Sequence, residues 1–270
     1  MNKQELIKKI IQKKEFSQLP ERDVERIFER FDIEEYSDEE KIKKTRELLG
    51  KIFWGFRSTK LLSPKNKDEE WILRKHLSTR ERIGMQSLSK PPRKSRRKRG
   101  QTRKRMNCYK ELYSKIFKNF KSGASVIDLG CAVNGFSYKF FPIKINYIGV
   151  EAVGQLVNLT NNYFKKNKIT GKIYHFSLFE LDKLKEIKQK TKKPRIVFLF
   201  KVLDALEVLE RDYSKKLLLK IMPLVDKIIV SFSTESMIKR EKFKVKRNWI
   251  VNFIKEKFKL AEDFEIKGER

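Results

Sequence analysis

From residue 122 onward, short apolar runs rich in β-branched residues alternate with longer stretches of helical spacing. The runs are ASVIDL (124–129), NYIGV (146–150), KIYHFS (172–177), RIVFLF (195–200) and DKIIVSF (226–232). Strands separated by helices are typical of βαβ units, in which helices cover both faces of a parallel sheet. The pattern therefore predicts an α/β domain that binds its ligand at the carboxyl ends of the strands.

The first run continues into a glycine turn, DLGCAVNG, in which Asp128 precedes Gly130, Cys131 and Ala132. Glycine lets the backbone approach a bound nucleoside closely, and a carboxylate can accept hydrogen bonds or balance an ammonium or sulfonium charge. Glu151 ends the second run about twenty residues later, where nucleotide-binding α/β domains place the carboxylate that holds the ribose hydroxyls. The turn is not G-x-G-x-x-G, which argues against NAD and favours the looser turn of methyltransferases.

Residues 1–89 have apolar side chains at helical spacing throughout, which predicts a small helical N-terminal domain. Pro20 is expected to open the second helix. Ser37 is expected to cap the third helix, with Glu40 at the capping-box position. We expect three parts: this domain, a basic segment at 90–105, and the α/β domain at 106–270.

The net charge of +30 is the strongest compositional signal. Self-repulsion of this size is tolerated mainly when the partner is a polyanion, so nucleic acid is the leading partner and an anionic membrane surface the second. The segment KPPRKSRRKRGQTRKR (90–105) holds ten basic residues and no acidic one, and it has no apolar face to bury. We expect it to contact RNA phosphates; the alternative is a solvated linker or a localisation signal.

Several classes of protein are disfavoured. The opening MNKQELIKKIIQKK has no apolar core of a secretory signal, and no stretch of the chain reaches about 18 apolar residues. We therefore expect a cytoplasmic protein with no membrane partner. The only cysteines are Cys108 and Cys131 and the only histidines His76 and His175, so we expect no disulfide framework and no metal site.

Four ordered segments carry a family resemblance. They are HLSTRER (76–82), DLGCAVNG (128–135), FLFKVLDALEVLERD (198–212) and VSFSTESM (230–237). They resemble, in turn, the H-x-S-T-x-E-R signature, the cofactor turn, the strand-four motif I-F-K-x-L-P-x-L-E and the V-S-F-P-T-R-S-L segment of the ribosomal RNA guanine-N7 methyltransferases that confer aminoglycoside resistance. The segment IIQKKEFSQLPERDVERIF (10–28) is similar to the opening helices of that family.

The resemblance implies a class I (Rossmann-like) methyltransferase sheet and S-adenosylmethionine as cofactor. It places Arg82 on the cofactor carboxylate, which suits a planar bidentate donor. It places Lys201 near the target base, so Arg82 and Lys201 are the expected catalytic residues, and it puts Glu180 near the adenine, where a plain surface carboxylate is the alternative. The residues expected to bind the cofactor are His76, Ser78, Thr79, Arg82, Asp128, Gly130, Cys131, Ala132, Glu151, Ala152, Leu178, Phe179, Glu180 and Phe200.

The implied reaction is methyl transfer to N7 of a guanine in small-subunit ribosomal RNA. N7 already carries a lone pair on the major-groove edge, so its methylation needs no general base. The enzyme must position the base and tolerate the positive charge that appears on the ring. The motifs contain no residue with an obvious proton-transfer role, which agrees with N7 and not with an N1- or N6-directed reaction.

The chain departs from the family pattern in three places. The basic segment 90–105 follows the H-x-S-T-x-E-R match, and IKREKFKVKR (238–247) replaces a glycine-rich loop, with Glu235 in place of the motif arginine. The run DFEIK (263–267) predicts a sixth strand, and the usual seventh strand is missing. The residues expected to contact RNA are Arg93, Lys94, Arg96, Arg97, Lys98, Arg99, Arg103, Lys104, Arg105, Lys239, Arg240 and Lys242.

Two other readings of the sequence remain open. A transfer-RNA guanine methyltransferase fits almost as well, because the altered basic segments are where the choice of substrate resides. A non-catalytic RNA-binding protein on the same fold would share the charge, but it need not retain Asp128, Glu151, Arg82 and Lys201 together. We expect a monomer that acts on ribosomal RNA or the small subunit, in a housekeeping role.

Overall fold

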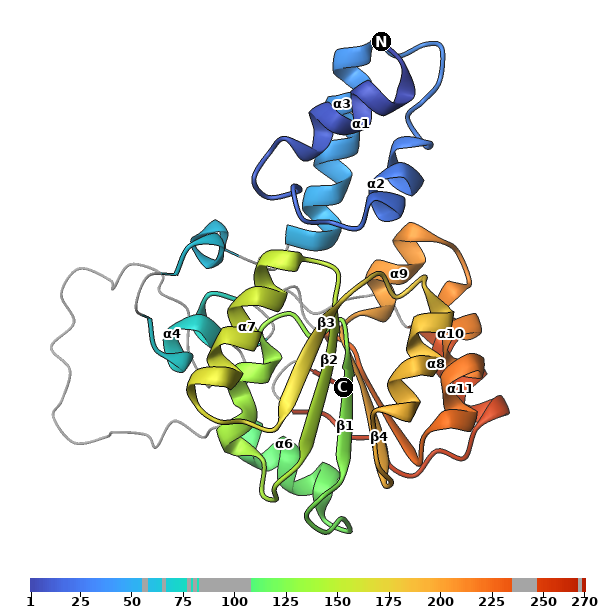
Figure 1. Ribbon diagram of the computed structural model, residues 1–270. Coiled ribbons are helices and arrows are strands. Elements are labelled where there is room, and N and C mark those ends of the chain that lie inside the picture. The colour runs from blue at the N-terminus through green and yellow to red at the C-terminus, as the bar shows by residue number, and fades with distance from the viewer. Residues whose placement is uncertain are drawn as a thin grey trace, which may run out of the picture.

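The apolar runs of the second half of the chain form one parallel sheet (Figure 1), as predicted. The computed structural model describes residues 1–54, 58–64, 67–76, 79, 82, 108–234, 247–266 and 269–270, and within them the sheet has five strands in the order β3-β2-β1-β4-β5. The order reverses between β1 and β4, which is the switch point where α/β sheets bind ligands. The strands are β1 (Ser125–Leu129), β2 (Asn146–Glu151), β3 (Gly171–His175), β4 (Arg195–Phe200) and β5 (Lys227–Ser231).

Helices cover both faces of the sheet, which explains why the central strands are apolar along their whole length. In β1, Val126 belongs to one buried cluster, while Ile127 and Leu129 belong to the other. The first face packs against α6 (Cys108–Phe117) and α7 (Gly154–Lys166). The second face packs against α8 (Leu181–Gln189), α9 (Leu203–Leu209), α10 (Tyr213–Ile221) and α11 (Asn248–Lys257).

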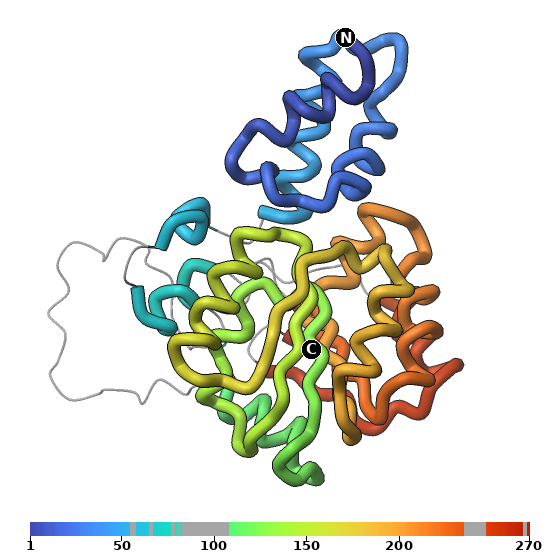
Figure 2. Tube along the Cα trace, viewed as in Figure 1, coloured from blue at the N-terminus to red at the C-terminus, as the bar shows by residue number. Residues whose placement is uncertain are grey.

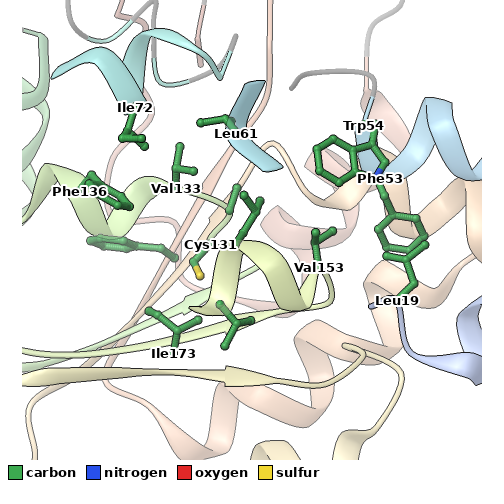
Figure 3. Packing of buried hydrophobic residues seen from close by; sticks show 14 of the residues in the cluster. Leu19, Phe53, Trp54, Leu61, Ile72, Cys131, Val133, Phe136, Val153 and Ile173 are labelled. Atoms are coloured by element: carbon green, nitrogen blue, oxygen red, sulfur yellow. The ribbon is translucent and has the colours of Figure 1, made fainter. Parts of the chain in front are cut away.

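The N-terminal part forms a helical lobe. Ser37 and Glu40 make the predicted capping box, and Pro20 directly precedes its helix. The lobe ends in a π-helical segment (Gly50–Trp54), which carries Phe53 and Trp54 to the side of Leu19 (Figure 3). Its helices are α1 (Lys3–Ile11), α2 (Glu21–Phe28) and α3 (Asp38–Leu49), and they are followed by a 3-10 turn (Thr59–Leu62) and the short α4 (Glu69–Arg74).

The helical lobe stands over the carboxyl ends of the strands (Figures 1 and 2). The carbonyl oxygen of Gln18 accepts a hydrogen bond from the backbone N–H of Gly154 at 3.0 Å. Arg26 pairs with Glu210 at 2.5 Å, and Arg30 donates to the carbonyl oxygen of Leu209 at 2.6 Å. These bonds hold α2 against the α/β part, so the lobe can contribute side chains to a site at this edge.

The predicted sixth strand at 263–267 does not form over its described residues, 263–266. Ile266 and Glu269 form only isolated bridges, one of them between Glu269 and Ser233, and residues 259–265 have no regular structure. The reason is that Arg270 binds Asp263 through two hydrogen bonds, so the segment folds back on itself instead of extending along β5.

The expected domain boundaries at residues 89 and 105 both lie outside the described residues.

Among the helices that the structure describes, none is long and apolar enough to cross a membrane.

Candidate active site

A pocket opens at the carboxyl ends of β1, β2 and β4, on the edge that the sheet topology predicts. The N-terminal lobe supplies part of its wall through Asp23, Ile52 and Phe53. Of the residues expected at the site, those that line the pocket are His76, Thr79, Arg82, Asp128, Gly130, Cys131, Ala132, Glu151, Ala152, Leu178, Phe179, Phe200 and Lys201. Side chains distant in sequence therefore converge as the motif pattern requires.

The turn after β1 brings the backbone close to this pocket. Gly130 has a φ of 71°, and a Cβ added there would lie 2.7 Å from the side chain of Val202. The backbone N–H groups of Gly130 and Cys131 donate to the carbonyl oxygen of Val150 at 2.9 and 3.1 Å, so the turn is tied to the neighbouring strand. The position therefore requires glycine for both its conformation and its lack of a side chain.

Asp128 lies buried beneath the turn. Its Oδ2 atom accepts a hydrogen bond from the side-chain amide of Asn134 at 2.7 Å and another from the hydroxyl of Tyr147. Burial raises the pKa of Asp128 to about 6, although both hydrogen bonds lower it. Asp128 is thus a preorganised carboxylate that ionises near neutral pH, and a neighbouring cation would favour its charged form.

Glu151 holds the other side of the same turn. One oxygen of its buried carboxylate accepts from the backbone N–H of Ala132 at 2.8 Å, and the other accepts from that of Val153 at 2.9 Å. Glu151 also lines the pocket. It therefore shapes the turn and is a carboxylate on the pocket wall at the position that its spacing suggested.

Arg82 and Lys201, which both line the pocket, form a buried cluster of charges with Glu269. The Arg82 Nε atom donates to Glu269 at 2.9 Å, and its Nη2 atom donates to the other oxygen of the same carboxylate. The Lys201 ammonium lies 3.2 Å from Glu269, and the Ser231 hydroxyl donates to it at 2.5 Å. The side chains of Arg82, Lys201 and Glu269 are only 5%, 6% and 11% exposed. Both expected catalytic residues therefore share one carboxylate.

The electrostatics of this cluster follow from its burial. Burial alone would raise the pKa of Glu269, but the charges of Arg82 and Lys201 lower it to about 2. Burial likewise opposes the charged form of Arg82, yet Glu269 raises the pKa of the guanidinium above its usual value. Arg82 and Glu269 therefore stay ionised together, and with Lys201 the cluster contains two basic side chains and one carboxylate, which suits a site for anions and for the electron-rich edge of a base.

Backbone geometry also directs Lys201. It has a φ of 57°, which is uncommon for a residue with a side chain, and its N–H donates to the carbonyl oxygen of Ser231 at 3.0 Å. This bend stops β4 and turns the chain into α9. Phe200 lies beside it, with its ring 4.2 Å from the Arg82 guanidinium carbon.

Glu180 lies elsewhere than expected. It does not line the pocket: one oxygen accepts from the backbone N–H of Ser177 at 3.1 Å and the other pairs with Lys183 at 2.5 Å. Ser78 and all of the residues expected to contact RNA, in 90–105 and 239–242, lie outside the described residues.

Both ends of the undescribed segment 235–246 lie close to the site. Arg247 binds both oxygens of Asp204, at 2.7 and 2.9 Å, and donates to the carbonyl oxygen of Ser233 at 2.8 Å. Asp204 belongs to α9, directly after the Lys201 bend.

Sequence reasoning missed three polar residues of the pocket region. Asn134 accepts from the Tyr109 hydroxyl at 3.0 Å and from Arg82 at 3.4 Å, so it links the turn to the charge cluster. Asp23 could have been noticed, because it lies four residues before Ile27 on the apolar face of α2, where a carboxylate is unusual. No comparable signal pointed to Glu269.

Solved structures resemble the whole chain. A 16S rRNA methyltransferase, RmtF, in complex with S-adenosyl-L-homocysteine matches with a TM-score of 0.71 and 16% identity, over 100% of this chain and 96% of that chain. The 16S rRNA methylase RmtB matches with a TM-score of 0.68 and 16% identity, over 100% and 96% of the two chains. An rRNA methylase from Escherichia coli matches with a TM-score of 0.68 and 15% identity, over 99% and 97%.

The chain has the fold of these rRNA methyltransferases. The likeness includes the helical lobe as well as the sheet, because it covers nearly the full length of both chains. No protein-family model matches the chain, and a search of curated protein sequences gives no significant match.

Proposed function

We propose that this protein is an S-adenosylmethionine-dependent RNA methyltransferase that methylates N7 of a guanine in small-subunit ribosomal RNA. The observation that carries the proposal is the convergence of Asp128, Glu151, Arg82 and Lys201 on one pocket at the switch point of the sheet. An RNA-binding protein without catalysis would not need these four charges in one buried place.

The residues of the pocket suit the parts of S-adenosylmethionine. When bound, this cofactor supplies a methyl group on a sulfonium. Asp128 accepts from its ammonium, and Glu151 accepts from its ribose hydroxyls. Arg82 lines the pocket, and the planar fork of its guanidinium suits the cofactor carboxylate. The glycine turn admits the nucleoside because no side chain projects from Gly130.

Lys201 orients the target base in this proposal. Guanine presents the O6 and N7 acceptors together on one edge, and an ammonium that binds O6 leaves N7 facing the methyl group. Adenine presents an amino donor at the corresponding place, which would repel a lysine. Glu269 lies 3.2 Å from the Lys201 ammonium and holds it in place.

The test is to incubate the protein with labelled S-adenosylmethionine and, separately, small-subunit RNA, large-subunit RNA, assembled small subunits and transfer RNA. The product base is then mapped by mass spectrometry and by cleavage specific for N7-methylguanine. Label on adenine, cytosine or ribose would contradict the guanine assignment, and label on transfer RNA alone would replace the proposed substrate.

Lys201→Ala should retain cofactor affinity and lose most methyl transfer, because the lost contact orients the reacting base. Lys185→Ala, which removes a lysine that is 60% exposed on α8, is the matched control and should turn over normally. If Lys201→Ala methylates RNA at the wild-type rate, Lys201 has no role in positioning the base.

A further inference from the structure

One buried acid in the pocket has no place in the proposed reaction. Asp23 comes from α2 of the N-terminal lobe, is 2% exposed, and lines the pocket together with Ser177, Leu178 and Phe179. The hydroxyl of Ser177 donates to its carboxylate at 2.6 Å. A carboxylate is almost never buried unless it has partners, so Asp23 needs a stronger reason to be there than one neutral hydrogen bond.

The position of Asp23 identifies the part of the ligand that it meets. Arg82 and Lys201 line the pocket and are bound together by Glu269, whereas Asp23 lines it beside Ser177, Leu178 and Phe179 of the loop that follows β3. In the proposed binding mode, the amino-acid part of the cofactor lies toward Arg82, so its adenine lies toward the Asp23 end. Apolar side chains flank this end, as a flat base requires.

The acid first expected at the adenine is engaged elsewhere. Glu180 uses one oxygen on the backbone of Ser177 and the other on Lys183. Asp23 is therefore the acid that the described residues place at this end of the pocket.

We propose that Asp23 recognises the exocyclic amino group of the cofactor's adenine, so that the N-terminal lobe determines the specificity of the pocket for that base. The inference rests on the proposed function, because it takes an adenosine cofactor as the ligand. It makes the helical lobe a part of the cofactor site and not only a contact surface for RNA.

The chemistry of the two groups is complementary. The amino group offers two N–H donors, and an ionised carboxylate only accepts. A hypoxanthine ring has an oxygen in place of this amino group, so it would set two acceptors against each other in a buried site. Leaving a buried charged group unpaired costs more than an ordinary hydrogen bond contributes, which predicts a preference for adenine of at least about tenfold.

The residues around Asp23 fix both the protonation state and the position of its carboxylate. Burial raises the pKa of Asp23 to about 6, while Ser177 and Arg26 lower it in part, so the group is ionised at pH 8. On the same helix, the Arg26 guanidinium lies 4.1 Å from the Phe179 ring and pairs with Glu210. These contacts keep α2 in register with the loop that bounds the adenine end.

The experiment compares two ligands by calorimetry at pH 8: S-adenosylhomocysteine and its deaminated analogue, S-inosylhomocysteine. The wild-type protein should prefer the adenine ligand at least about tenfold. Asp23→Asn should bring the ratio of the two affinities close to one, because an amide can accept from the amino group or donate to the oxygen. Glu180→Gln makes the same chemical change at the neighbouring acid and should leave the ratio unchanged.

The outcomes separate the two proposals. If Asp23→Asn weakens both ligands equally and keeps their ratio, Asp23 only stabilises the lobe and the inference is overturned. If the wild-type protein binds the two ligands equally, it is overturned as well, while the cofactor assignment stands. If the wild-type protein binds neither ligand, both proposals fail. Ser177→Ala removes the hydrogen bond that holds the Asp23 carboxylate and should reduce the preference for the adenine ligand, which tests the inference if Asp23→Asn does not fold.

Discussion

At the scale of single residues, the pocket contains charges that would be unstable alone. Arg82, Lys201 and Glu269 are each nearly inaccessible to water, and ionised groups persist there only when they compensate one another. Asp128 is as deeply buried, but its described partners are neutral donors. The first group therefore combines two basic side chains with one carboxylate, while the described hydrogen bonds to Asp128 come from neutral groups.

Glu269→Gln should lower the free energy of unfolding by about 3 kcal/mol, because it leaves two buried cations without their carboxylate. The pKa of Glu269 is lowered to about 2 from an ordinary value of 4.5, so its contribution is present above pH 4.5 and is lost as the pH falls toward 2. Urea unfolding from pH 2 to 7 measures both effects.

The matched control for this variant is Asp263→Asn. Its partner Arg270 is 45% exposed, and an exposed pair contributes about 1 kcal/mol or less. Equal losses from the two variants would show that Glu269 does not stabilise buried cations.

The affinity for S-adenosylhomocysteine should fall as the pH is lowered from 7 to 5. The pKa of Asp128 is raised to about 6, and the ligand's ammonium favours the ionised carboxylate, so binding weakens as the carboxylate takes up a proton. Asp128→Asn should bind weakly and with a smaller pH dependence, as measured by calorimetry, because Asp23, which also has a pKa of about 6, still titrates in the pocket. A dependence of undiminished size in Asp128→Asn would show that Asp128 does not bind the ammonium.

At the scale of elements, the site depends on how two adjacent strands end. β1 ends in a turn whose first residue, Gly130, has a positive φ, and β4 ends at Lys201, which also has a positive φ. Val202 lies between these two bends, because its side chain occupies the space that a Cβ on Gly130 would enter. The two strand ends therefore form one packed unit, and a change in either shifts the other.

Gly130→Ala should weaken cofactor binding at least tenfold, because the new methyl group forces the turn or Val202 to move. Calorimetry and thermal unfolding should show a folded protein with a displaced turn. Gly50→Ala is the control: nothing lies within 4 Å of its added Cβ, so cofactor affinity should be unchanged. Wild-type affinity in Gly130→Ala would mean that the ligand does not approach this turn.

At the scale of the whole molecule, the helical lobe and the α/β part both line the pocket, and the chain as a whole has a large positive net charge. The helical lobe provides Asp23, Ile52 and Phe53, the segment after α4 provides His76, Thr79 and Arg82, and the α/β part provides the remaining wall that the structure describes. The net charge of +30 suits a large polyanion, for which the basic segment 90–105 supplies ten charges. Binding of the cofactor and binding of RNA are thus expected to be separable by mutation.

Replacing the Arg and Lys residues of 90–105 by Ser should lower RNA affinity and flatten its dependence on salt, since each lost phosphate contact reduces the slope by about 0.7 to 0.9. Affinity for S-adenosylhomocysteine should remain at the wild-type value. Filter binding between 50 and 200 mM salt measures the slope, and a slope equal to that of the wild-type protein would make the segment a linker.

The sequence by itself determined the parallel sheet, the position of each of its five strands and the capping of the third helix, because these depend on local periodicity. It also indicated Asp128 and Glu151, because their spacing follows strand ends, while Arg82 and Lys201 came from the family resemblance. Only the tertiary structure decided that 263–266 forms no strand, that Glu180 does not line the pocket, that Asp23 does, and that Glu269 binds Arg82 and Lys201. The last two outcomes depend on contacts between residues more than a hundred positions apart, Asp23 with Ser177 and Arg82 with Glu269, and no local pattern encodes which distant charges a buried group will meet.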